Sequence, residues 1–353
     1  MKLEDTKTIN LPAHCLTMDQ SETGELFVAC YDGSIHRIDP ATGATTELAK
    51  LPNIASGVNW CAAAGRLVAA DYDGTLHWID PAAKAIERSY KAHGFWSWQS
   101  ARSADGKLLA SATGQYRVGG YKYEPAGERE PSVKVLDAKS GDTLHEFEHV
   151  PPVQSVAFSP DGSHLAAGNL MGEVRIWELE TGKEAARIET PSFTGWGIIK
   201  GHYYTGGVFA LQFAPDGESV YLAGMGTTRD PAAGNGAQLW EQWSWRNGKI
   251  EKLAAARGDE IGQGLMETLA FRPGGEHFTM AGRLFKGNWN IAVFDAAEGG
   301  RLAQANTNMR VSKALWSTDG KLLFLAGGGS QPKSMKDYDE GKPWGKLKIL
   351  EVS

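Results

Sequence analysis

One short unit recurs seven times along this 353-residue chain. Each unit has an apolar strand, a turn with glycine, a second apolar strand, and a third strand that ends in an apolar residue and an acid. The turn glycines are Gly24, Gly65, Gly106, Gly162, Gly217, Gly275 and Gly320. The acids are Asp39, Asp80, Asp137, Glu178, Glu241, Asp295 and Glu351. Such a repeat predicts one closed array of similar sheets, because a single unit cannot bury its apolar faces alone.

The fourth unit shows the internal order most clearly. Its turn, Ser159-Pro160-Asp161-Gly162, reverses the chain locally, because proline presets its dihedral angle and glycine accepts a positive φ. Alternating apolar residues place strands on both sides of this turn, and a second turn follows at Thr181-Gly182. The expected strands are residues 153–158, 164–169, 173–178 and 183–189. The unit is therefore expected to be a four-stranded antiparallel meander.

The spacing of the turn glycines, 41 to 58 residues, predicts an all-β fold: one seven-bladed β-propeller of four-stranded antiparallel blades over residues 1–353. The expected blades span about 12–50, 51–93, 94–149, 150–206, 207–260, 261–309 and 310–353. The last unit stops after three strands, and an open sheet edge invites aggregation. We expect the alternating run at residues 6–11 to close the ring as the missing outer strand.

These residues resemble the WD-repeat family of β-propellers, most closely in the fourth unit. The residues at that family's spacings are His149, Val153, Val156, Ala157, Phe158, Ser159, Pro160, Asp161, Gly162 and Trp177. The family's loop aspartate corresponds to Asp32 and Asp73, whereas Met171 takes that place in the fourth unit. The resemblance implies a rigid interaction platform with buried, hydrogen-bonding histidines at His93 and His149. It also implies an incomplete polar network, so packing must contribute more to stability.

Composition restricts the partners and the compartment. The formal net charge of -6 argues against nucleic acid or a membrane surface as the main partner, because both require a basic footprint. The three cysteines match no CxxC pattern and are expected to be buried thiols. No stretch has the length of a membrane span. The chain is expected to be cytoplasmic, or periplasmic or secreted if an export signal has been removed.

The long insertions fall on one side of the predicted ring. In an antiparallel meander, second-to-third loops and inter-unit connections share one rim. The insertions at 114–131, 190–207, 225–235 and 328–344 all lie on that rim, which usually indicates function. Its aromatic and basic residues either pack the loops or contact a partner, and as a set they favour a binding surface. The candidate binding residues are Trp96, Trp98, Tyr116, Arg117, Tyr121, Tyr123, Trp196, His202, Tyr203, Tyr204, Arg229 and Trp344.

Sequence motifs for a catalytic or metal-binding site are weak in this chain. His145-Glu146-Phe147-Glu148-His149 fits the HExxH pattern of zinc proteases, but its place predicts a strand, in which residues four apart are about 13 Å apart. The acidic run Asp337–Gly341 could attract calcium, although a solvated loop explains it better. No phosphate-binding loop or nucleophile elbow is present. We therefore expect no catalytic residue, no metal and no cofactor.

Two hypotheses follow. The first is a non-catalytic binding or scaffold module that presents the loop-rich rim to a protein or peptide. The alternative is an enzyme, or a protein that binds a saccharide or another small molecule, with its site at the mouth of the axial channel on the same rim. That alternative would use Trp96, Trp98, Tyr116, Tyr204, His202 and Arg229, because aromatic faces stack on sugar rings.

Overall fold

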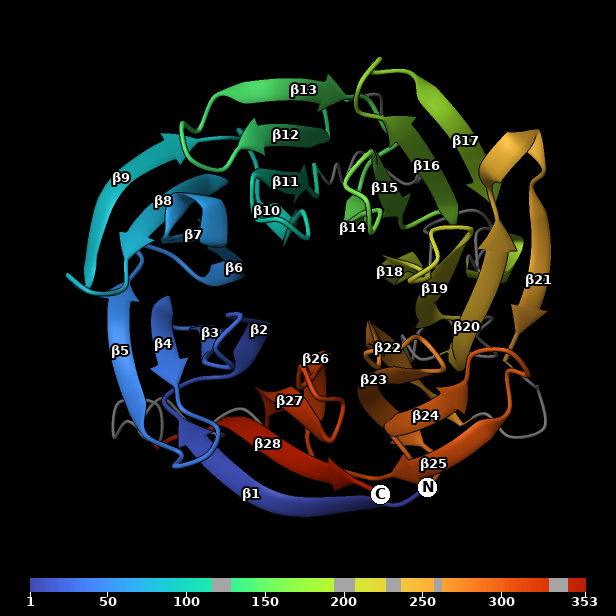
Figure 1. Cartoon of the computed structure of the whole chain (residues 1–353). Helices are drawn as coiled ribbons and strands as arrows, with labels where there is room; N and C mark the ends of the chain where they lie inside the picture. The colour runs from blue at the N-terminus through green and yellow to red at the C-terminus, as the bar shows by residue number, and fades with distance from the viewer. Residues whose placement is uncertain (116–127, 194–206, 227–235, 257–261, 330–341) are drawn as a thin grey trace, which may run out of the picture.

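The structure, a computed structural model, describes residues 1–115, 128–193, 207–226, 236–256, 262–329 and 342–353. In these residues the secondary structure consists of β-strands and three short 3-10 turns, η1 (Ala62–Ala64), η2 (Pro191–Phe193) and η4 (Arg246–Gly248). The sheets are arranged in a ring around an open axis (Figure 1). The predicted all-β propeller architecture is confirmed.

Five sheets have four antiparallel strands each. The first two contain β2 (Cys15–Gln20), β3 (Leu26–Cys30), β4 (Ser34–Ile38) and β5 (Thr45–Lys50), then β6 (Ala55–Cys61), β7 (Arg66–Asp71), β8 (Thr75–Asp80) and β9 (Ala85–Lys91). The next two contain β10 (Ser97–Arg102), β11 (Leu108–Thr113), β12 (Val133–Asp137) and β13 (Thr143–Phe147), then β14 (Val153–Phe158), β15 (His164–Asn169), β16 (Glu173–Glu178) and β17 (Glu184–Glu189). The fifth contains β26 (Arg310–Trp316), β27 (Leu322–Gly328), β28 (Gly345–Val352) and β1 (Leu3–Leu11).

The remaining sheet has eight strands. They are β18 (Gly207–Phe213), β19 (Ser219–Met225), β20 (Gly236–Ser244), β21 (Glu251–Ala255), β22 (Gln263–Phe271), β23 (His277–Lys286), β24 (Ile291–Asp295) and β25 (Arg301–Ala305). Two residue pairs join its halves, Gly236 with Gly264 and Ala237 with Gln263. We propose that each half is one blade, which would give the seven units of the sequence.

The inner strands form a closed circle. β2, β6, β10, β14, β18, β22 and β26 pack one against the next in chain order, and β26 packs against β2. They line the axis in Figure 1, while the fourth strand of each sheet lies at the outside. A closed circle leaves no sheet face without a neighbour, so the apolar cores lie between adjacent sheets.

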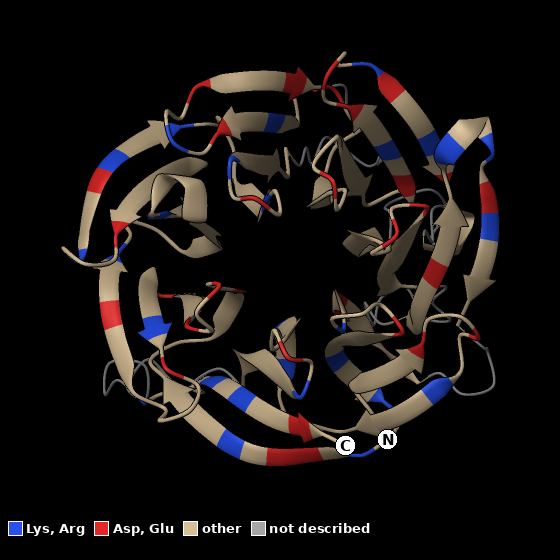
Figure 2. Cartoon of the chain, viewed as in Figure 1, with Lys and Arg blue, Asp and Glu red and all other residues tan. Residues whose placement is uncertain are grey.

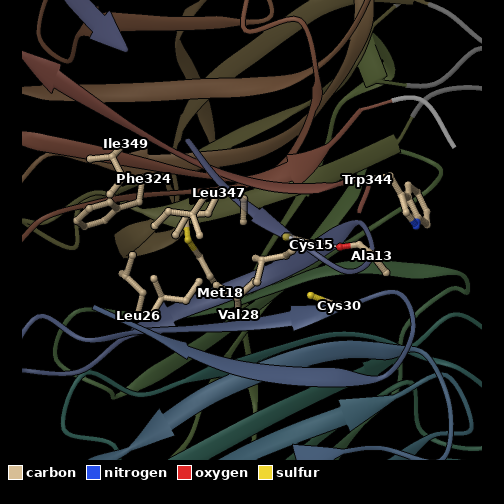
Figure 3. Packing of buried hydrophobic residues seen from close by; sticks show 14 residues of the cluster. Ala13, Cys15, Met18, Leu26, Val28, Cys30, Phe324, Trp344, Leu347 and Ile349 are labelled. Carbon is tan, nitrogen blue, oxygen red and sulfur yellow. Dashed lines mark hydrogen bonds between the residues drawn. The ribbon is translucent and has the colours of Figure 1, made fainter. Parts of the chain in front are cut away.

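The N-terminal strand completes the last sheet, as the sequence predicted. β1 pairs antiparallel with β28 from Leu3 opposite Val352 to Leu11 opposite Gly345. It begins earlier than the predicted residue 6. Ile9 and Leu11 are buried in one cluster with residues of β2, β27 and β28, part of which Figure 3 shows. Strand pairing and apolar packing therefore join the two ends of the chain.

The three cysteines are buried and free, as expected. Cys15 and Cys30 belong to the cluster of Figure 3. Burial, and to a smaller degree the charge of Asp19, raises the pKa of the Cys61 thiol to about 12. These thiols therefore behave as small apolar groups at neutral pH.

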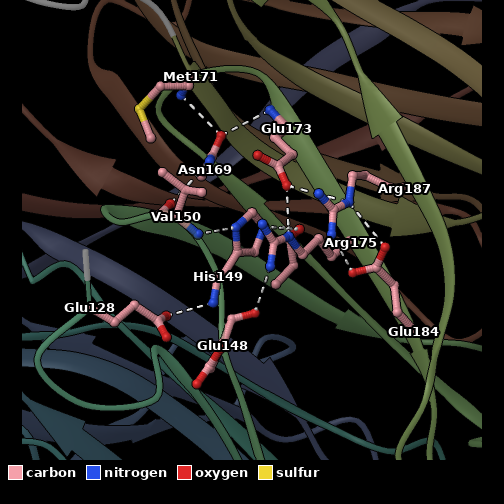
Figure 4. A network of polar contacts seen from close by, with 11 residues as sticks. Glu128, Glu148, His149, Val150, Asn169, Met171, Glu173, Arg175, Glu184 and Arg187 are labelled. Carbon is pink, nitrogen blue, oxygen red and sulfur yellow. Dashed lines mark hydrogen bonds and ion pairs between the residues drawn. The ribbon is translucent and has the colours of Figure 1, made fainter. Parts of the chain in front are cut away.

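The predicted buried histidines are confirmed. His93 Nε2 lies 3.1 Å from Ser111 Oγ. His149 Nε2 donates to the carbonyl of Ala167 (3.1 Å). Its Nδ1 accepts from the amide of Val150 (2.8 Å), as Figure 4 shows. Both nitrogens of His149 are thus used by the neutral imidazole. The histidine fixes the connection into β14.

The side chains that organise the loops between second and third strands differ in part from the sequence interpretation. Asp32 acts as the loop aspartate that the resemblance implied, because it accepts hydrogen bonds from the amide and hydroxyl of Ser34 (3.1 and 2.6 Å). In the fourth unit Asn169, two residues before Met171, accepts from the amides of Met171 (3.0 Å) and Glu173 (2.9 Å) (Figure 4). An amide oxygen therefore replaces the carboxylate, from an earlier position.

The second unit shows the same displacement. Asp71, not Asp73, accepts from the amides of Asp73 (2.9 Å) and Thr75 (3.0 Å). Its other oxygen lies 3.1 Å from His77 Nε2, and His77 Nδ1 lies 2.8 Å from Ser89 Oγ. The Asp71 carboxylate is buried, and these hydrogen bonds lower its pKa against the opposing effect of burial. The polar network of this unit is therefore more complete than the sequence indicated.

Removing residues 1–11 is expected to cause a large loss of thermal stability, because the edge of β28 and the apolar cluster behind it become exposed. A finer test compares Leu11→Ala with Asn10→Ala. Leu11 is buried and Asn10 is exposed, so the first substitution should lower the free energy of unfolding by about 2–5 kcal/mol and the second by much less. Urea titrations measure both. An unchanged melting curve for the deletion would refute closure by β1.

Candidate functional site

The loop-rich rim is the one at which first strands begin and second strands end. The antiparallel order of every sheet places the second-to-third loops and the inter-sheet connections on this rim. The opposite rim carries the short turns, whose seven predicted glycines all have a positive φ. The strand ends that flank residues 116–127, 194–206, 227–235, 257–261 and 330–341 lie on the loop-rich rim. The predicted asymmetry between the two rims thus agrees with the strand topology.

Most of the predicted binding residues lie outside the described residues. They are Tyr116, Arg117, Tyr121, Tyr123, Trp196, His202, Tyr203, Tyr204 and Arg229. Their roles stay predictions from the sequence. The three predicted site residues that the structure describes are Trp96, Trp98 and Trp344, and they occupy three different environments.

Trp96 is a partly exposed ring in the middle of an aromatic stack. It precedes β10 and is 45% exposed. Its ring stacks on Tyr72 (centroids 5.5 Å apart, planes 11° apart) and on Phe95 (5.1 Å, 21°). A side chain at Gly74 would collide with the carbonyl oxygens of His93 and Phe95, so glycine lets the loop of Tyr72 approach this connection. The two neighbouring rings therefore hold the partly exposed Trp96 ring in a fixed orientation.

Trp344 instead packs into the core. It is 9% exposed, and its ring contacts His14 (5.8 Å) and Tyr31 (5.8 Å). Figure 3 shows it at the edge of the cluster under β1. A Cβ at Gly345 would collide with the carbonyl oxygen of Ala13, so the chain beside Trp344 fits closely against the entry to β2. Trp344 thus supports the closure of the ring.

Trp98 belongs to a ring of bulges that the sequence did not reveal. In each of the seven inner strands one residue interrupts the pairing with the second strand, near the loop-rich rim. The bulged residues are Leu16, Ser56, Trp98, Gln154, Phe209, Glu267 and Ser312. A bulge redirects its side chain and increases the local twist. Sequence periodicity gave no signal for these bulges, because an added residue leaves the apolar alternation readable on both sides.

An ion pair and a histidine lie at the channel mouth. Arg310, at the start of β26, makes a bidentate pair with Glu267 (Nε to Oε1 2.7 Å, Nη2 to Oε2 2.8 Å). His14 Nε2 lies 2.8 Å from Ser312 Oγ. Burial, and then the charge of Arg310, lowers the pKa of His14 to about 4. Burial also raises the pKa of Tyr72. At neutral pH His14 is therefore uncharged, and Arg310 is neutralised by Glu267.

The axis holds a cavity of about 260 Å³. All seven inner strands contribute to its wall, and its polar and charged lining residues include Asp19, Asn59, Gln99, Arg102, Gln212, Glu267 and Lys313. This volume is below the range of about 300–1,000 Å³ that is typical of pockets for drug-sized ligands. The channel can therefore hold water or a small polar ligand.

Side chains connect the inner strands across the channel wall. Asp19 accepts from the amide of Trp60 (2.7 Å) and pairs with Arg102 (2.6 Å). Gln99 Oε1 accepts from the amide of Val156 (2.7 Å). These contacts satisfy strand amides that would otherwise be unpaired at the inner edges of the sheets.

The structure describes one of the two sequence motifs that we considered as metal sites. The expected strand is present at His145 as part of β13, but it ends at Phe147, so His149 lies beyond it. The described ranges contain no group of three or more His, Cys, Asp and Glu side chains placed to hold a metal ion. The acidic run at 337–341 lies outside them. No helix in the described part is long and apolar enough to cross a membrane.

The closed ring of antiparallel sheets around a channel is that of a β-propeller. Residues 141–178 match the family "WD domain, G-beta repeat" (WD40). THO complex subunit 3 from Arabidopsis thaliana is 23% identical over 189 residues, which cover 53% of this chain and 51% of that protein. The chain thus matches about half the length of that relative. The chain therefore has a β-propeller fold and contains one segment that is similar to a WD40 repeat.

The matched repeat is displaced from the sheets by one strand. Residues 141–178 run from the turn before β13 through β16, so they include the outer strand of one sheet and three strands of the next. A repeat with this offset links neighbouring sheets covalently. It also explains why the last sheet takes its outer strand from the N-terminal segment.

Acid should destabilise the protein between about pH 6.5 and 4.5. Burial lowers the pKa of His14 and His93 to about 4 and that of His149 to about 3. The unfolded chain, with histidine pKa values near 6.5, therefore binds protons first as pH falls. Each histidine should cost about 2–3 kcal/mol of stability at pH 4.5 relative to pH 7.5.

Urea unfolding at a series of pH values measures this effect. His93→Gln should lower stability at pH 7.5 but flatten the pH dependence, because one buried imidazole is removed. His145→Gln, in the outer strand β13, is the matched control and should keep the slope of the parent protein. Equal slopes for the parent and His93→Gln would contradict the assignment.

Proposed function

We propose that this protein is a non-catalytic scaffold whose loop-rich rim binds a protein or peptide partner. The observation that carries the proposal is the Tyr72–Trp96–Phe95 stack, which presents an exposed ring in a fixed orientation. Rigid aromatic side chains are enriched among residues that dominate binding energy, because they offer a large contact area at a small entropy cost. The WD40 repeat and a relative that is named as a subunit of a complex support an interaction role.

The distribution of charged residues also supports the proposal, although less strongly than the aromatic stack. Lys, Arg, Asp and Glu residues are interspersed along the outer strands (Figure 2). In β9, for example, Glu87 and Arg88 are neighbours, and Glu87 pairs with Arg66 (2.6 Å). Mixed charges do not attract a partner of one sign over long distances. We therefore place partner recognition at the rim, and a cytoplasmic location remains the prediction from the sequence.

The alternative of a saccharide or small-molecule site at the channel mouth shares Trp96 with this proposal. Its other predicted residues include Tyr116, His202, Tyr204 and Arg229, which lie outside the described ones. It remains a prediction from the sequence. A ligand screen by thermal shift distinguishes it, since a sugar that stabilises the protein through Trp96 would favour it over the scaffold.

The experiment compares Trp96→Ala with Tyr90→Ala. Both rings are partly exposed, Trp96 at 45% and Tyr90 at 38%, but Tyr90 lies on the outer strand β9. Affinity purification of the tagged full chain, with quantitative mass spectrometry, should show partners that fall more than tenfold with Trp96→Ala and persist with Tyr90→Ala. A tenfold loss corresponds to about 1.4 kcal/mol of binding energy.

Both variants should keep the melting temperature of the parent, which shows that a lost partner is not a lost fold. Trp344 is unsuitable as a probe, because its ring supports the core. Retention of every partner by Trp96→Ala, or an equal loss with Tyr90→Ala, would overturn the proposed use of this rim.

A further inference from the structure

Two of the seven neighbouring pairs of inner strands, β10 with β14 and β22 with β26, satisfy a strand amide in the same way. In each pair, the residue after the bulge of the first strand accepts a hydrogen bond from the amide of the second residue after the bulge of the next strand. Gln99 accepts in this way from the amide of Val156 (2.7 Å), and Thr268 Oγ1 accepts from the amide of Ala314 (3.0 Å). In both cases an oxygen is the cap.

Lys313 occupies the same position in β26. It follows the bulged residue Ser312, and β2 is the next inner strand around the ring. The equivalent amide in β2 is that of Met18, two residues after the bulge at Leu16. An ammonium has three donors and no acceptor, so Lys313 cannot cap an amide as Gln99 and Thr268 do. Between β26 and β2 there is therefore a hydrogen-bond donor at the position where the other two strand pairs have an acceptor.

Of the charged residues that line the cavity, Lys313 is the one without an ion pair within the described residues. Among the charged residues of the cavity wall, Asp19 pairs with Arg102 (2.6 Å), and Glu267 pairs with Arg310 at the mouth (2.7 Å). Asp19 also accepts from two backbone amides. Within the described residues, Lys313 makes no ion pair and no side-chain hydrogen bond. A half-buried cation without a counter-charge is costly unless a ligand or water compensates it.

A second polar group faces the same space. Gln212, on β18, lines the cavity and makes no side-chain hydrogen bond among the described residues. Its amide nitrogen can donate to an oxygen ligand. The volume of about 260 Å³ is small for an organic cofactor but sufficient for an ion with its water.

We propose that the axial channel binds a small oxyanion, such as phosphate, sulfate or a short carboxylate, with Lys313 as its principal ligand. An oxyanion supplies hydrogen-bond acceptors between β26 and β2, and it supplies a negative counter-charge for Lys313. This site is separate from the aromatic stack on the rim. It belongs to the interior of the ring.

Burial lowers the pKa of Lys313, and the charge of Asp19 partly opposes this effect. A bound anion would favour the ammonium further, so anion binding and protonation of Lys313 strengthen each other. Without an anion, burial disfavours the charged form of this lysine.

Thermal unfolding of the full chain in sodium phosphate, sodium sulfate or sodium acetate, against sodium chloride at matched ionic strength and pH 7, tests the site. The parent protein should show a saturable rise in melting temperature with at least one oxyanion, since a ligand that binds only the folded state stabilises it. Comparing the three salts distinguishes a phosphate-type ligand from a carboxylate.

Lys313→Met should abolish that rise while melting at or above the parent in chloride, because the unpaired charge is gone. Lys183→Met is the matched control: Lys183 is exposed and follows a turn on the opposite rim, and this variant should keep the full response. Lys313→Gln serves the same purpose if the methionine variant does not fold. Phosphorus-31 NMR line broadening of phosphate by the parent, absent in the Lys313 variant, gives a direct readout.

Two results would overturn the proposal. One is a salt response that is the same in the parent, Lys313→Met and Lys183→Met, which would show a general effect of the salts on the protein surface. The other is the absence of a saturable response of the parent to all three oxyanions, which would mean that water alone solvates Lys313.

Discussion

Closure of the ring is the constraint on which the rest of this structure depends. Every sheet has two apolar faces, and a neighbouring sheet covers each of them only when the circle is complete. The pairing of β1 with β28 completes it, while His14 and Ser312 join the same seam near the axis. Because the seam is made of both strand pairing and packing, the inner strands keep a fixed arrangement around the channel. That rigidity is what allows one rim to carry long loops without loss of the fold.

The regular parts of this fold could be predicted from the sequence, because their causes are local. Turn glycines, apolar alternation and the third-strand acids mark the strands, and the unpaired last unit points to the N-terminal segment as its outer strand. The buried roles of His93 and His149 were implied by the resemblance to WD-repeat proteins. The turns and strands are set by residues within one unit, whereas the role of the N-terminal segment follows from the strand that the last unit lacks.

The details that differ arise from contacts between units or from small shifts along the chain. Asp71 and Asn169 cap loops from two residues before the expected position, since a side chain can reach the same amides from either place. Trp344 belongs to a loop by sequence, yet its ring is buried against His14 and Tyr31 of other segments. The inner bulges leave the apolar pattern intact. The position of Lys313 on β26 next to the inner strand β2 becomes visible only when these two segments, which are distant in the sequence, are brought together.

The structure thus separates two surfaces that the sequence treated as one. The rim has one exposed ring, Trp96, within an aromatic stack, to which we assign the proposed protein or peptide partner, whereas the channel has polar groups and a cation in a small volume. Binding at one surface requires no contact at the other. The two proposals can therefore fail independently.

Native-state hydrogen exchange tests the central claim, ring closure by β1, most directly. Closure predicts that the hydrogen-bonded amides of β1 exchange only when the whole protein unfolds, with the same free energy as those of β27 in the same sheet. Exchange of the β1 amides a thousandfold faster than that of β27, with the remaining strands still protected, would show that the ring holds without this strand and would contradict the account.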